Sequence, residues 1–345
     1  MIAETVRPEA SPADRMEAML TGHFVAQCLQ AVVVLGIADS LAEGPRTIAA
    51  ITEATGCHQM SLRRLMRTLA SVGVFAEPAP GTYELTPLGA TLRSDAGFLR
   101  DKAMWIISPQ LWSAWGALTD TLRSGKPSFP AVHGLPLFQY LAEHVEPRAM
   151  FSRFMTEQSA TQNAAVVEAY DFAGIRTLVD VGGGQGATLT AVLRHYPAMK
   201  GILFDLPEVA TTARFEGADL GGRCQAVGGD MHKAVPAGAD AYLIQRVMMD
   251  YADDRAITLL RNCVAAMDPA GRILVVDPTV PDVPEPHQNF LTDMQMLILT
   301  GGRCRTETEF RGLFGAAGLT VTRIVPTRSP NIVIEGRLTA KSHGW

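Results

Sequence analysis

Short apolar runs alternate with helical patterns along the C-terminal half of the chain. Five of these runs predict strands, near residues 177–181, 201–205, 223–227, 240–246 and 272–277. Strands that alternate with helices form a parallel sheet that is covered by helices on both faces. Two more runs, 319–325 and 331–337, are separated by too few residues for a crossover helix, so they are expected to pair antiparallel. The pattern predicts a seven-stranded α/β sheet that ends in a hairpin.

The N-terminal part of the chain shows helical periodicity followed by a hairpin pattern. Residues 13–42 carry apolar residues at i, i+3 and i+4 spacing, and residues 47–56 form a shorter helical pattern. Ser61 is the expected N-cap of a third helix over residues 62–72. Residues 75–85 predict two strands joined by a turn of proline and glycine. Helix–turn–helix followed by a hairpin predicts a winged helix.

A helical region is expected between these two parts. Residues 101–170 are rich in tryptophan, phenylalanine and methionine, and prolines and glycines break the helical pattern at 125–130 and 134–136. The chain of 345 residues is long enough for two domains. We therefore expect a winged-helix domain over residues 1–100, a helical region over 101–170 and an α/β domain over 171–345.

The charge distribution disfavours nucleic acid as a partner. Arg63, Arg64 and Arg67 lie on the candidate recognition helix of the winged helix. The net charge of the chain, however, is −5, which gives no general attraction to nucleic acid or to anionic membranes. Glu77 and Glu84 also lie in the expected wing, where phosphate contacts require cations. We predict neither nucleic acid nor membrane as a partner.

The cysteines and the N-terminal segment indicate a cytoplasmic protein. The five cysteines include no CxxC pair, so they are expected to be reduced thiols rather than disulfides or zinc ligands. The N-terminal residues lack the apolar region of a signal peptide. The most apolar window, residues 24–37, is interrupted by two glutamines and is too short to cross a bilayer, so a buried helix is expected there.

A glycine-rich loop follows the first strand of the α/β part. The segment LVDVGGGQG, residues 178–186, places four glycines within five positions directly after an apolar run. Glycine has no Cβ, so a ligand can approach the backbone N–H groups and the chain can take positive φ. Gly182 and Gly184 also fit the dinucleotide pattern GxGxxG/A. The loop predicts a nucleotide site but does not distinguish NAD from S-adenosylmethionine (SAM).

Two acidic residues at later strand ends help to choose between these ligands. Asp205 ends the second run, at a position that suits a carboxylate bound to ribose hydroxyls, which both ligands have. The third run ends in Gly-Asp-Met, where Asp230 could accept a hydrogen bond from the adenine amino group and Met231 could cover the ring. This motif and the antiparallel last strand favour SAM.

Together these motifs resemble the class I SAM-dependent methyltransferases. More narrowly, the chain resembles the small-molecule O-methyltransferases related to plant caffeate and isoflavone enzymes and to bacterial polyketide-tailoring enzymes. The matching motifs are LVDVGGGQG (178–186), FDLP (204–207), GGDM (228–231), RVMMDYADD (246–254) and GGRCRTETEF (301–310). The resemblance implies a Rossmann-like methyltransferase domain, a winged-helix domain that forms a homodimer, and SAM as the cofactor, with S-adenosylhomocysteine as its product.

The resemblance also implies positions for the binding residues. The expected cofactor residues are Ser159, Gly182, Gly184, Asp205, Leu206, Asp230, Met231, Gln245 and Arg246. Gln245 stands where many relatives have lysine or arginine. The expected acceptor pocket is lined by Trp112, Phe151, Met155, Asp293 and Met294. Methionine side chains are flexible and polarisable, which suits them to contact a flat acceptor.

The chain departs from its family at the catalytic positions. The O-methylating relatives place a histidine base after the fourth strand and steady it with two glutamates. Here Met249 occupies the base position, and a thioether does not accept a proton. Cys304 replaces the first glutamate, and the second aligns with Glu335. Asp250, which follows Met249, is a candidate to receive a proton late in the reaction, and Asp293 is another.

Three interpretations of this departure stay open. The favoured one is a methyltransferase whose small aromatic or heterocyclic acceptor needs no strong base, so that alignment drives transfer to nitrogen, carbon, sulfur or an acidic oxygen. In the second, a SAM-binding member of the family performs decarboxylation, hydroxylation or cyclisation, with the sulfonium acting as an electrostatic element. In the third, the chain is a non-catalytic dimeric partner.

Histidine and cysteine side chains offer few alternatives. His23 and His133 are weaker candidates for a pocket base. Cys304 is a weak acid at best, since the free thiol pKa of about 8.5 does not suit it to deprotonate an alcohol. His287 is more often a solvated side chain than a metal ligand in such a position, and no second imidazole accompanies it. We predict no metal.

Overall fold

The structure is a computed structural model that describes residues 11–213, 215, 220 and 222–339. It divides into two compact units. The first, here called the N-terminal unit, contains residues 1–113 and 141–157, and the second, the α/β unit, contains residues 114–140 and 158–345, as far as they are described. The expected helical region 101–170 is therefore shared between the two units instead of forming a part of its own.

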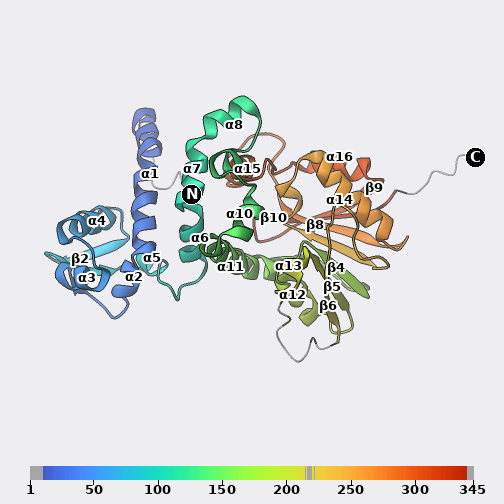
Figure 1. Ribbon diagram of the computed structural model, residues 1–345, viewed down its shortest axis with the longest axis horizontal. Helices are drawn as coiled ribbons and strands as arrows, with labels where there is room; N and C mark the ends of the chain where they lie inside the picture. Colours follow the sequence, from blue (N-terminus) through green and yellow to red (C-terminus); the bar gives the residue numbers. More distant parts are fainter. Residues whose placement is uncertain (1–10, 214, 216–219, 221, 340–345) are drawn as a thin grey trace, which may run out of the picture. The chain divides into compact units, whose positions relative to one another are not determined.

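The N-terminal unit contains helices and a small three-stranded sheet of order β1-β3-β2 (Figure 1). Its elements are α1 (Pro12–Val34), α2 (Ile37–Ser40), β1 (Arg46–Thr47), α3 (Ile48–Thr55), α4 (Gln59–Ser71), β2 (Phe75–Ala79), β3 (Thr82–Leu85), α5 (Pro87–Ala90), α6 (Phe98–Ile106), the start of α7 (Pro109–Gly116), the end of α10 (Leu137–Glu143) and the start of α11 (Val145–Ala169). Helix α3 and the β2–β3 hairpin agree with the short helix and the hairpin that the sequence pattern predicts. The order of the elements is that of a winged helix.

Two local predictions in this unit are wrong. The predicted helix 13–42 ends at Val34, because Gly36 takes a left-handed φ of 64° before α2 begins. Ser61 is not an N-cap, since α4 begins at Gln59 with His58 as the capping residue. The Ser61 hydroxyl lies 3.1 Å from the His58 ring instead. Both errors come from turn geometry, which the apolar spacing does not report.

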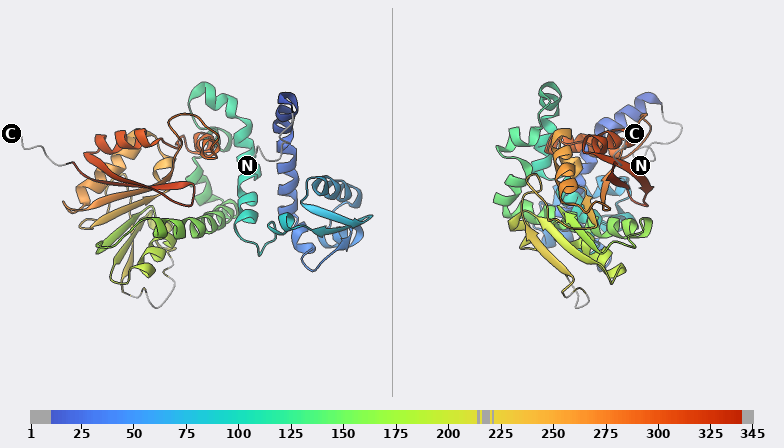
Figure 2. Two further views of the ribbon diagram at one scale, coloured as in Figure 1. Left: turned by 180° about the vertical axis from the view of Figure 1, so that it is seen from behind. Right: turned by 90° about the vertical axis from the view of Figure 1, so that its right-hand side faces the viewer.

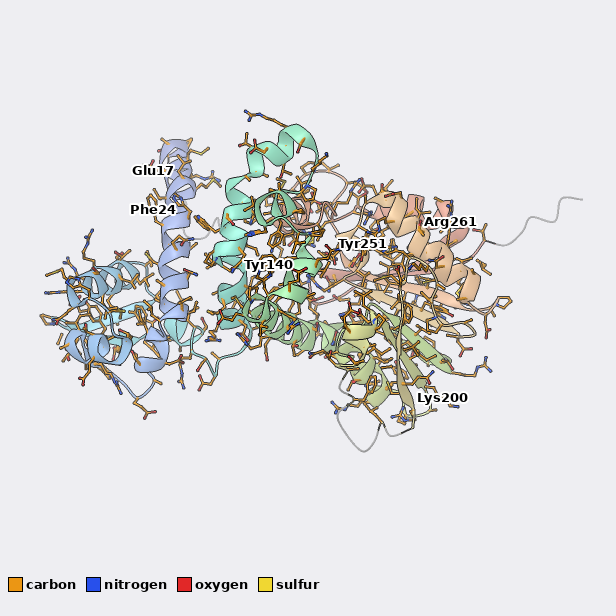
Figure 3. All side chains as sticks on the ribbon, viewed as in Figure 1. Glu17, Phe24, Tyr140, Lys200, Tyr251 and Arg261 are labelled. Carbon is orange, nitrogen blue, oxygen red and sulfur yellow. The ribbon has the colours of Figure 1, made fainter. Side chains whose placement is uncertain are left out.

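Helix α1 is largely exposed, which contradicts the prediction of a buried helix over residues 24–37. Phe24 is 59% exposed and Leu20 is 62% exposed, while the buried residues of α1 are Val32 and Val33. Figure 3 labels Glu17 and Phe24 on this helix. By length and apolar composition, α1 is also the one described helix that could cross a membrane. A periodic apolar stripe predicts a surface that becomes covered, but not what covers it.

The α/β unit is built on a seven-stranded sheet of order β6-β5-β4-β7-β8-β10-β9 (Figures 1 and 2). Its strands are β4 (Thr177–Val181), β5 (Lys200–Asp205), β6 (Cys224–Gly228), β7 (Ala241–Gln245), β8 (Arg272–Pro278), β9 (Leu319–Pro326) and β10 (Asn331–Leu338). Strands β4 to β8 pair in parallel, and β10 pairs antiparallel with both β8 and β9. The predicted sheet with an antiparallel last strand is confirmed.

Helices cover the sheet on both faces. Those of the α/β unit, including three that begin or end in the N-terminal unit, are α7, α8 (Leu118–Ser124), α9 (Ser128–His133), α10 (Leu137–Glu143), α11 (Val145–Ala169), α12 (Ala187–His195), α13 (Pro207–Ala210), the 3-10 helix η3 (Met248–Asp250), α14 (Asp253–Ala266), α15 (Asn289–Leu299) and α16 (Glu307–Ala316). Successive strand residues alternate between two cores: Val179 packs with α14 and α16, and Leu178 packs with α11 and α12. A parallel sheet buried on both faces presents its functional groups at the carboxyl ends of its strands.

Candidate active site

The glycine loop after β4 has the open geometry that a nucleotide requires. Gly182, Gly184 and Gly186 take left-handed φ values of 74°, 60° and 88°. A Cβ on Gly182 would lie 2.6 Å from the Val247 side chain, so packing requires glycine there. A Cβ on Gly184 would meet no atom within 4 Å, so space lies open above the loop. Glycine is required at 184 by its conformation and leaves its backbone accessible to a ligand.

Asp205 joins the end of β5 to this loop. Its carboxylate accepts hydrogen bonds from the Gly184 N–H at 2.8 Å and from the Leu206 N–H at 2.7 Å. Burial raises the pKa of Asp205, while these two N–H groups lower it. The carboxylate lies at the strand-end edge, as predicted, and it also fixes the conformation of the loop.

The next strand end gathers polar and aromatic side chains around Asp230. Asp230 accepts a hydrogen bond from the His232 N–H at 2.9 Å, and Met231 is half-buried against the core. The His232 ring lies 4.6 Å from that of Tyr251, edge to face. Both His232 ring nitrogens are buried without a hydrogen-bond partner among the described residues. Burial lowers the pKa of His232, so its imidazole is neutral at neutral pH.

Sequence reasoning missed His232 and Tyr251. The pKa of Tyr251 is raised first by burial and then by Asp250, while Asp205 and Asp230 also raise it, so the phenol lies within electrostatic reach of all three carboxylates. Their positions in the sequence could have indicated them, since His232 directly follows the Gly-Asp-Met motif and Tyr251 directly follows Asp250.

A polar cluster lies beside the glycine loop on the α11 side. Asn163 is buried, and its side-chain oxygen accepts hydrogen bonds from Gln245 at 2.8 Å and from Thr188 at 2.9 Å. The side-chain oxygen of Gln245, Oε1, is buried without a hydrogen-bond partner among the described residues. Ser159 lies one helical turn before Asn163 on α11. Asn163 and Thr188 were not predicted, because nothing in their local sequence marks them.

The segment after β7 places Met249 in a tight, buried turn. Arg246 has a φ of 54° and is the one non-glycine residue with left-handed φ in the part of the chain that the structure describes. Met249 is 2% exposed, and its carbonyl accepts a hydrogen bond from the Arg303 N–H at 2.9 Å. A Cβ on Gly302 would lie 2.1 Å from that same carbonyl, so the 301–303 segment can pack on Met249 only with glycine at 302.

Four charged groups, two carboxyl groups and two guanidinium groups, lie around this turn. Burial raises the pKa of Asp250 to about 7, while the nearby Arg246 guanidinium lowers it. Asp277, at the end of β8, is fully buried, and burial raises its pKa to about 7 against the lowering effect of Arg246 and Arg305. Asp250 and Asp277 therefore both change protonation state near neutral pH.

Cys304 is close to Met249 but is not a base. Its backbone N–H donates to Asp293 on α15 at 2.7 Å, and its neighbour Arg303 is bonded to Met249. Burial raises the pKa of the Cys304 thiol to about 12, and Asp293 adds to the shift. The thiol therefore stays protonated. The structure thus brings Met249, Asp250, Asp293 and Cys304 together, with Met294 next to Asp293 on α15.

Glu335 does not belong to this group, so its predicted catalytic role is wrong. It lies in the middle of β10 opposite Leu274, several residues from the strand-end edge. Its carboxylate is 2% exposed and accepts hydrogen bonds from Tyr170 at 2.5 Å, Thr322 at 2.8 Å and Arg337 at 3.0 Å. Despite burial, these bonds hold the pKa of Glu335 below its ordinary value. It is a structural carboxylate that links Tyr170, directly after α11, to the sheet.

Replacing Tyr170 with phenylalanine is therefore expected to lower stability and leave catalysis intact. Removing one partner of a buried, charged hydrogen bond costs about 1.5–3 kcal/mol. The thermal midpoint of Tyr170→Phe should fall by several degrees, and kcat should stay near that of the wild type. Thr308→Val is the matched control, because the Thr308 hydroxyl bonds to Asp282 at the surface. A large loss of kcat in Tyr170→Phe without a loss of stability would contradict this assignment.

The remaining predicted pocket residues are divided between the two units. Trp112, Phe151 and Met155 belong to the N-terminal unit, where the Phe151 ring lies 5.0 Å from Trp105. Asp293 and Met294 belong to the α/β unit. That these five residues line one pocket stays a prediction.

The histidines named as alternatives lie in local contacts. His23 Nδ1 lies 2.7 Å from the Leu20 carbonyl, and the His23 ring lies 6.2 Å from that of Trp112. His133 packs against Phe129. His287 Nδ1 accepts a hydrogen bond from the Asn289 N–H at 3.3 Å. Within the described ranges, no group of three or more His, Cys, Asp or Glu residues is placed to hold a metal ion.

Comparison with known families identifies the class of protein that this fold and site define. Residues 115–320 match the O-methyltransferase domain, and residues 17–95 match the O-methyltransferase dimerisation domain. The chain belongs to this O-methyltransferase family.

Individual relatives cover nearly the whole chain. It is 38% identical to a phenazine O-methyltransferase of Lysobacter antibioticus, over 92% of this chain and 94% of that one. It is 34% identical to the 8-amino-8-demethylriboflavin N,N-dimethyltransferase of Streptomyces davaonensis, over 97% of this chain and 98% of that one. A solved O-methyltransferase from neocarzinostatin biosynthesis, in complex with SAM and 2-hydroxy-5-methyl naphthoic acid, is 30% identical with a TM-score of 0.81, over 91% and 96% of the two chains.

The protein is a SAM-dependent methyltransferase, and the residues at the strand-end edge fit that cofactor. The open space above Gly184 leaves room for a ligand against the backbone. The unpartnered Gln245 Oε1 is an acceptor that suits the ammonium group of the methionine part. The carboxylates of Asp205 and Asp230 suit ribose hydroxyls and an adenine amino group.

Proposed function

We propose that this enzyme methylates an amine or an acidic hydroxyl group on a small, flat secondary metabolite without a histidine base. The observation that carries the proposal is Met249, a buried thioether at the position where the family resemblance expects the base. Bound SAM supplies a methyl group that its sulfonium has already activated. The protein must then mainly align the acceptor, which contributes ~7–11 kcal/mol in well-oriented reactions. The relatives named above support a flat acceptor, since they act on or bind phenazine, flavin and naphthoate ring systems.

Asp250 is the proposed proton acceptor. A base is most effective when its pKa lies near the working pH. The Asp250 carboxyl, with a pKa raised to about 7, can take a proton from an acidic phenol, an enol or a nitrogen that has just been methylated. It is too weak to deprotonate an ordinary alcohol. Cys304, with a pKa raised to about 12, is excluded from this role because its thiol does not ionise.

The cofactor would be held by the strand-end residues. Asp205 would bind the ribose, Asp230 the adenine amino group, and Met231 with Tyr251 the adenine ring. Gln245 would receive the ammonium group of the methionine part. Ser159, another expected cofactor residue, lies one helical turn from Asn163, the hydrogen-bond partner of Gln245.

The test combines binding with product analysis. Isothermal titration of the full chain with SAM and S-adenosylhomocysteine should show binding of both. Mass spectrometry of a panel of hydroxylated and aminated aromatic compounds should then show the addition of one methylene unit. Turnover of a compound without this mass change would favour decarboxylation, hydroxylation or cyclisation instead. No binding of either nucleoside would leave only the non-catalytic partner.

A homodimer formed through α1 completes the proposal. The match to a dimerisation domain over residues 17–95 includes most of α1, on which Met19, Leu20 and Phe24 are exposed in the single chain. Burying each large apolar side chain contributes about 1.5–3 kcal/mol. A second copy of the chain therefore explains this surface better than a membrane does.

Charges on the apolar face of α1 are expected to separate the dimer. Leu20 and Phe24, one turn apart, are both about 60% exposed. The double variant Leu20→Asp/Phe24→Asp should elute as a monomer in size-exclusion chromatography with light scattering, because unpaired charges resist burial. Glu17→Gln on the same helix is the control and should stay dimeric. A monomeric wild type, or a double variant that stays dimeric at micromolar concentration, would refute this interface.

A further inference from the structure

A cavity of about 240 Å³ opens in the α/β unit beside Asp250. Its apolar lining residues include Leu137, Phe138 and Leu299, and its polar lining residues include Asp250, Tyr251 and Arg255. None of its lining residues belongs to the glycine loop, and the pocket residues expected from the sequence do not line it. The cavity is smaller than the ~300–1,000 Å³ that a whole drug-sized ligand occupies, so it suits one end of a ligand.

Arg255 gives this cavity a positive charge that no neighbouring carboxylate takes up. It is the only cationic side chain among the lining residues that the structure describes. Its guanidinium lies 4.7 Å from the centre of the Tyr251 ring, which orients the planar group. No carboxylate of the described residues lies within ion-pair distance of it. The nearby Asp253 is engaged by Arg305 at 2.8 Å and Arg303 at 3.9 Å.

We propose that this cavity binds the distal end of a flat aromatic acceptor that carries a carboxylate, with the carboxylate held by Arg255. Arginine presents a planar fork of N–H donors that matches a carboxylate. The apolar lining residues Leu137, Phe138 and Leu299 would contact the ring. Asp250 also lines the cavity and repels an anion, so the two charges favour an acceptor whose carboxylate lies at Arg255 and whose reacting group lies at Asp250.

This inference rests on the proposed function and deepens it, because Asp250 is shared between the cavity and the reactive site. The carboxylate end would point to Arg255, and the hydroxyl or amine to be methylated would lie toward Asp250. The acceptor class narrows to aromatic hydroxy acids or amino acids whose acidic group lies away from the methylated atom.

The test compares one carboxylate with its neutral analogue. The full-length protein, saturated with S-adenosylhomocysteine and also without it, is titrated with 6-hydroxy-2-naphthoate and with 6-hydroxy-2-naphthamide, in which the hydroxyl lies at the opposite end of the ring system from the acid or amide. We expect the carboxylate to bind at least about tenfold more tightly than the amide, because the charge-assisted bond is lost in the amide. Arg255→Gln should remove this preference, and Arg255→Lys should keep part of it.

Arg261→Gln is the matched control on the same helix. Figure 3 labels Arg261 farther along α14, where its guanidinium donates to the Ala316 carbonyl at 2.9 Å, and this residue does not line the cavity. The control should keep the full preference for the carboxylate, and all variants should bind S-adenosylhomocysteine as the wild type does.

Several outcomes would overturn the carboxylate subsite. They are equal affinity for the two compounds in the wild type, an unchanged preference in Arg255→Gln, and no binding of either compound at millimolar concentration. If S-adenosylhomocysteine still binds in these cases, the proposed methyl transfer stands and only the subsite fails. If the nucleoside does not bind, the proposed function itself fails, and the titrations without it still decide the role of Arg255.

Discussion

Replacing Asp205 with alanine is expected to weaken SAM binding by about a hundredfold or more. The Asp205 carboxylate holds the Gly184 and Leu206 N–H groups at 2.8 and 2.7 Å and is the proposed ribose ligand. Hydrogen bonds to charged groups contribute about 1.5–3 kcal/mol each, and ~1.4 kcal/mol corresponds to a tenfold change in affinity. A carboxylate that binds both ribose hydroxyls makes two such bonds to the cofactor, and their loss gives the expected hundredfold effect. Isothermal titration with SAM and with S-adenosylhomocysteine measures it.

Two further variants separate the carboxylate from general changes in charge. Asp205→Asn keeps one acceptor oxygen and should fall between the wild type and Asp205→Ala. Glu208→Gln, three residues along the chain on an exposed position, should bind SAM as the wild type does. If Asp205→Ala binds within about threefold of the wild type, a change well under 1 kcal/mol, the strand-end edge is not the ribose site.

Replacing Asp250 with asparagine is expected to lower kcat by about 10²–10⁴, the usual contribution of a general base. Asparagine keeps the size of the side chain and lacks the proton-accepting carboxylate. The dissociation constant for SAM should not change, because Asp250 is not proposed to contact the cofactor. Single-turnover measurements with a saturating acceptor separate this loss in the chemical step from any loss in binding.

The pH profile provides an independent check of the same role. Burial raises the pKa of Asp250 to about 7, so the carboxylate that accepts the proton is present above this pH and is lost as the pH falls through it. The rate of the wild type should therefore fall about tenfold per pH unit below pH 6 and level off above about pH 8. Arg246 lowers this pKa, so Arg246→Gln should move the profile to higher pH.

Asp250→Asn should lose this pH dependence. A wild-type rate that does not change between about pH 5 and 8 would show that solvent takes the proton and that alignment alone drives the transfer. The same conclusion would follow if Asp250→Asn kept more than about a tenth of the wild-type kcat.

Much of the fold and of the cofactor edge could be predicted from local sequence. The strand runs, the glycine loop and the position of Asp205 at the end of β5 agree with the structure, because each is set within a few residues: an apolar run, a left-handed turn and a carboxylate at a strand end. The hairpin of β9 and β10 followed from the length of its connection, which leaves no room for a helix. These features depend on backbone geometry that neighbouring residues dictate.

The helix boundaries of the N-terminal unit were less predictable. Gly36 and His58 decide where α1 ends and α4 begins, through a positive φ and through the choice between two possible caps. The exposure of Phe24 was also not available from the pattern. Periodicity shows that a helix has an apolar side, while only the assembled structure shows whether this chain covers that side.

The sequence by itself determined the class of enzyme, the order of the motifs at the strand ends and the absence of an imidazole at position 249. Only the tertiary structure decided which acids can work there. Glu335 seemed catalytic by alignment, but its depth along β10 and its bond to Tyr170, 165 positions away, make it structural. Burial raises the pKa of Asp250 to about 7, which suits a base at neutral pH, and that of Cys304 to about 12, which keeps the thiol protonated. Neither shift can be predicted from local sequence, because desolvation depends on every element packed around a group.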